Sequence, residues 1–153
     1  MKRMDHTGEI KRILLVDDNK SGAPARKSAL GEHGFEVSTA SSGHEALEIF
    51  QQSHFDLVVT DYRMPRMNGV QLITALRELR PGLPVVILSG FAETGGLTEA
   101  TTGANIVLQK GANECQHLLR AVNRLLFQRA TRKPASSAAG RKTSAASAAS
   151  KRK

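Results

Sequence analysis

Four short aliphatic runs constrain the fold of this chain more than any other feature of its sequence. They are ILLV (13–16), LVV (57–59), VVIL (85–88) and IVL (106–108). Each run is too short for a helix and lacks the polar–apolar alternation of a strand with one face in water. Continuous apolar strands are typical of parallel sheets that are covered on both faces. The runs therefore predict a parallel sheet between two layers of helices.

Helical patterns lie between these runs, and a fifth strand with alternating character is predicted at 35–39, at an edge of the sheet. Apolar residues recur at helical spacing in three segments: 43–53, 69–80 and 113–130. A weaker helix is predicted at 21–33, where Leu30 is the only large apolar residue. The segment 92–103 contains adjacent glycines and four threonines, so we expect a short or frayed helix there. The predicted fold class is α/β, a doubly wound five-stranded parallel sheet with helices on both faces.

Two side chains test the helical patterns. Leu79 is predicted on the apolar face of the helix at 69–80, together with Leu72, Ile73 and Leu76. Phe127 lies opposite Leu118 on an ideal helix, so it is predicted to face away from the core, at a frayed end or on an interaction surface.

The positive charge of the chain is concentrated near its end. The net charge is +8, from 22 Lys and Arg against 14 Asp and Glu. All 14 acidic residues and 14 of the basic ones precede Gln128, so the first 127 residues are neutral. A nucleic-acid-binding fold with cations spread over its working face is therefore disfavoured. Residues 129–153, rich in Ala, Ser, Lys and Arg, are predicted to be a disordered basic tail.

Cysteine content and hydropathy favour a cytoplasmic protein. Cys115 is the single cysteine and cannot form an internal disulfide. The longest aliphatic runs have four residues, far fewer than a transmembrane helix needs, so we expect no transmembrane segment.

Polar residues follow the predicted strands directly. Asp17 and Asp18 follow the first run, Asp61 the third strand, Ser89 the fourth and Lys110 the fifth. Because the carboxyl ends of parallel strands meet at one edge of a sheet, where ligands bind, these side chains are expected to converge.

Three carboxylates that lie together repel one another, so the site must take up a proton or a cation. An oxygen-only ligand set favours a hard ion, and a partly hydrated Mg²⁺ is the expected cofactor. A divalent cation beside an ammonium and a hydroxyl suits a phosphoryl group. An aspartate could attack phosphorus to form an acyl phosphate, and Asp61 is the best placed because it is central and followed by a turn.

These motifs together resemble the receiver domain of two-component response regulators. They are ILLVDD (13–18), VVTDYRMPRMNG (58–69), VVILSG (85–90) and the lysine at 110, in that order. The resemblance covers roughly residues 11–130 and implies a flavodoxin-like sheet with strand order 2-1-3-4-5. It divides the chain into an N-terminal extension (1–10), a receiver domain (11–128) and the basic tail (129–153).

The resemblance also implies roles for the polar residues. Asp61 would accept the phosphoryl group, and Lys110 and Ser89 would contact it. The Mg²⁺ ligands would be the carboxylates of Asp17, Asp18 and Asp61 and the backbone carbonyl of Arg63. We interpret Met64-Pro65 and Asn68-Gly69 as scaffolding of the loop, with glycine present for a positive φ.

Two positions depart from the usual receiver pattern. Val107 stands where receivers commonly carry an aromatic residue, and Gly111 replaces the proline that usually follows the lysine. The phosphorylation chemistry is expected to be intact, but its relay to an output surface is expected to be weaker or differently routed.

The expected function is that of a stand-alone response regulator, a phosphoacceptor rather than an enzyme with a separate catalytic domain. Its expected partners are a sensor histidine kinase or phosphotransfer protein and an unknown downstream protein. In one alternative, the basic tail binds DNA without sequence specificity and the protein acts as a phosphorylation-dependent nucleic-acid-binding regulator. The tail could equally contact an acidic or anionic surface, or only confer solubility. In another, the chain is a Mg²⁺-dependent phosphatase, but Arg63 occupies the position where that chemistry would place a second acid.

Overall fold

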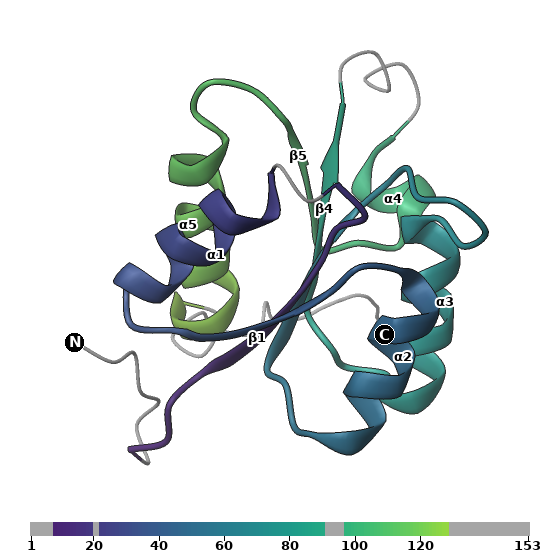
Figure 1. Ribbon diagram of the computed structural model, residues 1–153, viewed down its shortest axis with the longest axis horizontal. Coiled ribbons are helices and arrows are strands. Elements are labelled where there is room, and N and C mark those ends of the chain that lie inside the picture. Colours follow the sequence, from purple (N-terminus) through teal and green to yellow (C-terminus); the bar gives the residue numbers. More distant parts are fainter. Residues whose placement is uncertain (1–7, 20–21, 91–96, 129–153) are drawn as a thin grey trace, which may run out of the picture.

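Five parallel strands form one sheet in the order β2-β1-β3-β4-β5 (Figure 1). The computed structural model describes residues 8–19, 22–90 and 97–128. The strands are β1 (Arg12–Val16), β2 (Glu36–Ala40), β3 (Leu57–Asp61), β4 (Val85–Ser89) and β5 (Ile106–Gln109). The helices are α1 (Ala23–Glu32), α2 (Gly43–Gln52), α3 (Gly69–Leu79), α4 (Glu99–Thr102), α5 (Glu114–Asn123) and the π-helical segment η2 (Arg124–Gln128). The predicted α/β class and strand order are confirmed.

Two apolar layers cover the sheet, one on each face. Ile13 and Leu15 pack with residues of α1 and α5, whereas Leu14 and Val16 pack with residues of α2 and α3. Figure 1 shows the corresponding helix pairs on opposite sides of the sheet. Because successive side chains of a strand point to opposite faces, a strand buried on both faces must be apolar throughout. This is why the central strands read as unbroken aliphatic runs.

Local sequence signals start and end the helices. Asn68 and Gln71 form a reciprocal capping box at the start of α3, and Ser42 accepts a hydrogen bond from the Glu45 backbone N–H at the start of α2. The weak helix expected at 92–103 is observed as the four-residue α4, which ends at Gly103 with a φ of 83°; positions 91–96 lie outside the described residues, as does the tail at 129–153. Among the helices that the structure describes, none is long and apolar enough to cross a membrane.

Leu79 and Phe127 contradict the ideal helical patterns. Leu79 is 49% exposed and is the last residue of α3. Phe127 packs against the α1–α5 side of the core and its ring lies 6.3 Å from that of Phe35. It lies within η2, and the wider turn of a π-helix changes the angle between successive side chains. Phe127 is therefore a core contact and not a frayed end.

Candidate functional site

The carboxyl edge of the sheet gathers the polar residues that follow the strands. Asp61 ends β3, Ser89 ends β4, and Asp17 and Lys110 directly follow β1 and β5. The Lys110 backbone N–H donates to the Ser89 carbonyl at 2.8 Å, which joins the ends of β4 and β5. Asp17, Asp61 and Ser89 are buried, and Asp18 is exposed at the rim. The structure brings together the side chains of Asp17, Asp18, Asp61 and Lys110, whereas the Ser89 hydroxyl donates to the Gly90 carbonyl at 3.1 Å.

Three carboxylates at this edge match the requirements of a magnesium ion. One oxygen from each of Asp17, Asp18 and Asp61 can be chosen so that all lie within 4.8 Å of one another. Two oxygens on opposite sides of an octahedral Mg²⁺ are about 4 Å apart, so a small adjustment would suffice. Asp61 Oδ1 is buried, with no hydrogen bond of standard geometry from the described residues and with the Lys110 ammonium as its nearest cation. Arg63 lies two residues after Asp61, in the loop between β3 and α3.

Asp61 carries a perturbed charge. Burial, together with hydrogen bonding to Asp17 and the charge of that carboxylate, raises the pKa of Asp61 to about 7 from the ordinary value of 3.8. Lys110 opposes this rise. Its Nζ forms an ion pair with Asp61 Oδ1 at 3.0 Å. Near neutral pH, Asp61 is therefore partly protonated and partly ionised.

Arg26 joins this site although nothing in the sequence analysis pointed to it. Its side chain is 6% exposed, forms an ion pair with Asp17, and has Nη1 4.0 Å from Asp61 Oδ1. On its other side, Nε donates to Glu114 Oε2 at 2.6 Å. Burial disfavours the charged guanidinium and by itself would lower the pKa of Arg26. The hydrogen bond from Arg26 to Glu114 and the negative charges of Glu114, Asp17 and Asp61 outweigh this effect, so the pKa is raised.

One signal could have identified Arg26. It precedes Leu30 by four residues on α1, so both side chains lie on the same face of that helix. Leu30 is fully buried, which places a cation where the helical pattern calls for an apolar residue. Glu114, at the start of α5, carries no comparable signal.

The loop after Asp61 is shaped by a close backbone contact at Gly69. A Cβ atom there would lie 2.6 Å from the Asp61 carbonyl oxygen, closer than real Cβ atoms approach. The Gly69 N–H also donates to the Tyr62 carbonyl at 2.7 Å. The expectation of a positive φ at Gly69 is wrong; in this loop the positive φ, of 68°, belongs to Arg66. Glycine is needed here for space rather than for backbone angle.

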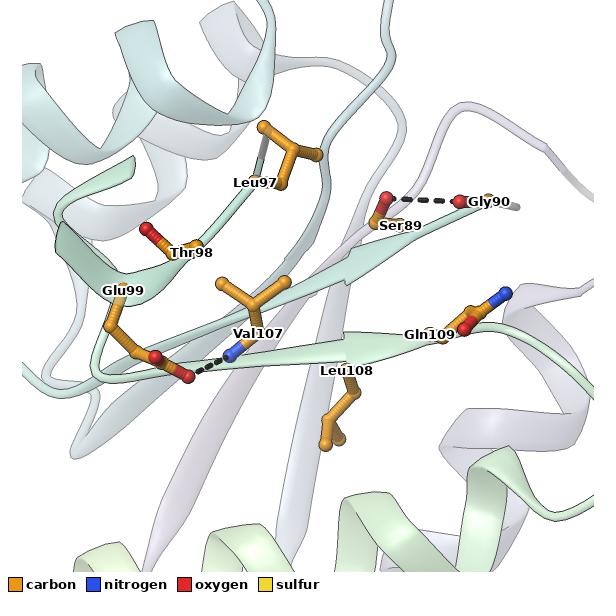
Figure 2. Close-up of a pocket in the computed structure, with 8 residues that line it drawn as sticks. All are labelled: Ser89, Gly90, Leu97, Thr98, Glu99, Val107, Leu108 and Gln109. Carbon is orange, nitrogen blue, oxygen red and sulfur yellow. Dashed lines mark hydrogen bonds between the residues drawn. The ribbon is translucent and has the colours of Figure 1, made fainter. Parts of the chain in front are cut away.

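A pocket of about 280 Å³ opens beside Ser89, between the ends of β4 and β5 and the start of α4 (Figure 2). The Val107 side chain points into it, and that of Leu108 points away (Figure 2). The Val107 backbone N–H donates to Glu99 Oε2 at 3.2 Å, which ties β5 to α4. The pocket is lined by Ser89, Gly90, Leu97, Thr98, Glu99, Val107, Leu108 and Gln109. The small side chain of Val107 leaves this space open.

Sheet order, acidic edge and facing lysine together define a flavodoxin-like α/β domain with a candidate cation site at the switch of strand order. The response regulator receiver domain family matches residues 13–123. The chain belongs to this family, whose members take part in two-component signalling and generally bind Mg²⁺.

Known proteins agree with this assignment. A response regulator receiver protein of Anaeromyxobacter sp. (strain Fw109-5) is 35% identical over 91 residues, which cover 60% of this chain and 38% of that protein. Regulatory protein AtoC of Escherichia coli (strain K12) is also 35% identical over 91 residues, 60% of this chain and 20% of AtoC. The match therefore spans well under half the length of these relatives.

Solved structures show the same architecture. A response regulator receiver domain protein of Clostridium thermocellum aligns with a TM-score of 0.72 and 30% identity, over 80% of this chain and 98% of that one. The response regulator TrrA of Thermotoga maritima, solved in complex with Mg(2+)-BeF, aligns with a TM-score of 0.69 and 30% identity, over 76% of this chain and 100% of that one.

Proposed function

We propose that this protein accepts a phosphoryl group on Asp61 from a histidine kinase or phosphotransfer protein. The observation that carries the proposal is the buried Asp61 Oδ1, which has no hydrogen bond of standard geometry from the described residues and faces the Lys110 ammonium at 3.0 Å. A nucleophile needs an unshared oxygen, and a transferred phosphoryl group needs a nearby cation.

In the proposed reaction, an ionised oxygen of Asp61 forms a bond to phosphorus as the bond from phosphorus to the donor histidine nitrogen breaks. The electron pair of that bond stays on the imidazole. Lys110 would neutralise an oxygen of the transferred group, and the Ser89 hydroxyl at the end of β4 would donate to another. Asp17, Asp18, Asp61 and the carbonyl of Arg63 would hold Mg²⁺, which supplies charge neutralisation for the phosphoryl oxygens.

We also propose that the chain acts as a stand-alone regulator that signals by protein–protein contact, with a receiver at 11–128 between a short extension (1–10) and a basic tail (129–153). Residues 128–153 of the sequence contain no Val, Ile, Leu, Met or aromatic residue. On this proposal the protein is a phosphoacceptor without a separate catalytic domain. A reducing cytoplasm is the compartment that best suits its single cysteine.

Incubation of the full chain with acetyl phosphate and Mg²⁺ tests the proposal. Intact-mass spectrometry should show the addition of one phosphoryl group to the wild type and none to Asp61→Asn. Asp56→Asn is the matched control, because Asp56 immediately precedes β3 at the opposite end of the same strand; it should label like the wild type. Equal labelling of Asp61→Asn would refute the assignment, as would an unlabelled wild type.

A further inference from the structure

Arg26 is a buried cation between two helices and three carboxylates. The ion pairs with Asp17 and Glu114 connect α1 to the loop after β1 and to the start of α5. Taking a guanidinium out of water is costly unless several partners compensate it. Here the compensation comes from the side chains of the candidate metal site itself, so the role of Arg26 depends on what that site contains.

Counted over the residues that the structure describes, the ionised site carries a net charge of −2. Four carboxylates, those of Asp17, Asp18, Asp61 and Glu114, face two cations, Arg26 and Lys110. This remaining charge equals the charge of one divalent cation. Without Arg26 the site would be more negative still, and among the described residues Asp17 would keep no ion pair beside the buried Asp61.

Both oxygens of Asp17 are already engaged. Oδ1 accepts from the Asn19 backbone N–H at 2.8 Å, and Oδ2 is the oxygen paired with Arg26. A metal ion that takes Oδ2 of Asp17 therefore competes with a protein cation for that oxygen. Glu114 is the second partner of the guanidinium, because its Oε2 accepts from Nε at 2.6 Å. This partner remains if the pair with Asp17 is broken.

We propose that Arg26 is a built-in counter-ion of the acidic site, which holds Asp17 in the absence of a divalent cation and shifts toward Glu114 when the cation binds. The proposal rests on the proposed function, because it assumes that the site takes Mg²⁺. In this arrangement Arg26 is a positioning residue: it lowers the affinity for the metal and connects metal binding to another helix.

Through Glu114, Arg26 connects the candidate metal site to the first turn of α5. Glu114 is the first residue of that helix, and its other oxygen, Oε1, accepts from the Gly111 backbone N–H at 3.1 Å. Gly111 in turn follows Lys110, the residue paired with Asp61. A guanidinium that moves from Asp17 toward Glu114 thus changes the charge balance at both the start of α5 and the loop that carries the lysine.

Magnesium titration of the full chain tests the competition. Tyr62 is the only tyrosine, the chain has no tryptophan, and Tyr62 adjoins Asp61, so intrinsic fluorescence reports on this site. Arg26→Met should bind Mg²⁺ about tenfold more tightly than the wild type, because one positive charge is removed within a few ångströms. Arg26→Lys, which keeps the charge but lacks the planar five-donor guanidinium, should lie between them.

Thermal unfolding separates this role from a merely structural one. Arg26→Met should melt at a lower temperature than the wild type without Mg²⁺, since it leaves buried carboxylates unpaired. Saturating Mg²⁺ should then raise its melting temperature by more than it raises that of the wild type. An equal rise in both proteins would overturn the proposal even if the variant is less stable.

A double-mutant cycle with Glu114→Gln tests the alternative partner. Glu114→Gln alone should weaken Mg²⁺ binding several-fold, because Arg26 then has only Asp17 and Asp61 to pair with. In the Arg26→Met background the same change should have a smaller effect, limited to the loss of a nearby negative charge. Glu32→Gln, which removes an acid from the exposed end of α1, is the matched control and should leave affinity unchanged.

The outcomes distinguish the two proposals. If wild type and Arg26→Met bind Mg²⁺ equally while Asp61 is still phosphorylated, the counter-ion role is refuted and the proposed function stands. If neither protein binds Mg²⁺, both proposals fail. Should Arg26→Met not fold, Glu114→Gln alone decides: unchanged affinity relative to the wild type would refute the counter-ion role.

Discussion

Lys110 Nζ lies 3.0 Å from Asp61 Oδ1, although the two residues lie at the ends of β5 and β3 and β4 separates these strands. The lysine side chain therefore reaches across a neighbouring strand to the central carboxylate. Its charge offsets only part of the effect of burial and of Asp17, since the pKa of Asp61 is still raised to about 7. Asp61 thus has a folded-state pKa well above the 3.8 of an ordinary aspartate.

This raised pKa predicts a pH-dependent loss of stability in the absence of Mg²⁺. Between about pH 4 and 7 the folded chain binds a proton at Asp61 that the unfolded chain has released, so the free energy of unfolding falls as pH rises. Asp61→Asn does not titrate and should escape this loss. Its free energy of unfolding relative to the wild type should increase over that range by roughly 1–3 kcal/mol.

Urea denaturation of both proteins at a series of pH values measures this difference. Added Mg²⁺ should reduce it, because the cation favours the ionised carboxylate. A difference that stays constant from pH 4 to 8 would contradict the raised pKa.

Gly69→Ala should damage the site through the backbone. The added Cβ would meet the Asp61 carbonyl oxygen at 2.6 Å, so either the loop or the end of β3 must move. We expect a loss of about 1–3 kcal/mol in the free energy of unfolding and slower labelling by acetyl phosphate. Gly31→Ala is the control: it is exposed in α1 with no atom within 4 Å of the new Cβ, and should stabilise by about 0.5–1 kcal/mol. Similar behaviour of the two variants would refute the close-contact explanation.

Leu76 and Leu79 offer a matched pair on one helix. Leu76 is fully buried and Leu79 is 49% exposed. Leu76→Ala should lower the free energy of unfolding by about 2–5 kcal/mol, whereas Leu79→Ala should change it by less than about 1 kcal/mol. Chemical denaturation followed by circular dichroism measures both. A large loss for Leu79→Ala would show that its side chain is covered in solution.

Val107→Tyr should fill the pocket beside Ser89. The ring would enter the space of about 280 Å³ into which Val107 points, and it would link β5 to α4 more firmly. We expect beryllofluoride, a phosphoryl mimic, to produce a larger change in hydrogen exchange over 97–109 in this variant than in the wild type. Val107→Thr has nearly the shape of valine, leaves the pocket open and serves as the control. If tyrosine and threonine respond alike, Val107 does not limit the coupling.

The fold and the positions of the polar residues were predictable because both depend on local pattern. Unbroken aliphatic runs separated by helical segments indicate a parallel sheet, and the ends of its strands can be located in the sequence. The sequence alone therefore places Asp17, Asp61 and Lys110 at one edge of the sheet. The exposure of Leu79 and the core contact of Phe127 were predicted wrongly, because each depends on where a helix ends or how tightly it is wound.

The sequence by itself determined the class of fold, the family and the chemistry-bearing residues at the strand ends, since periodicity and spacing are properties of the chain alone. Only the tertiary structure decided that Arg26 bridges Asp17 and Glu114. That contact joins residues 88 positions apart and exists because α1 and α5 pack side by side on one face of the sheet. A buried charge takes its partners from whichever helices surround it, and packing in three dimensions determines which these are.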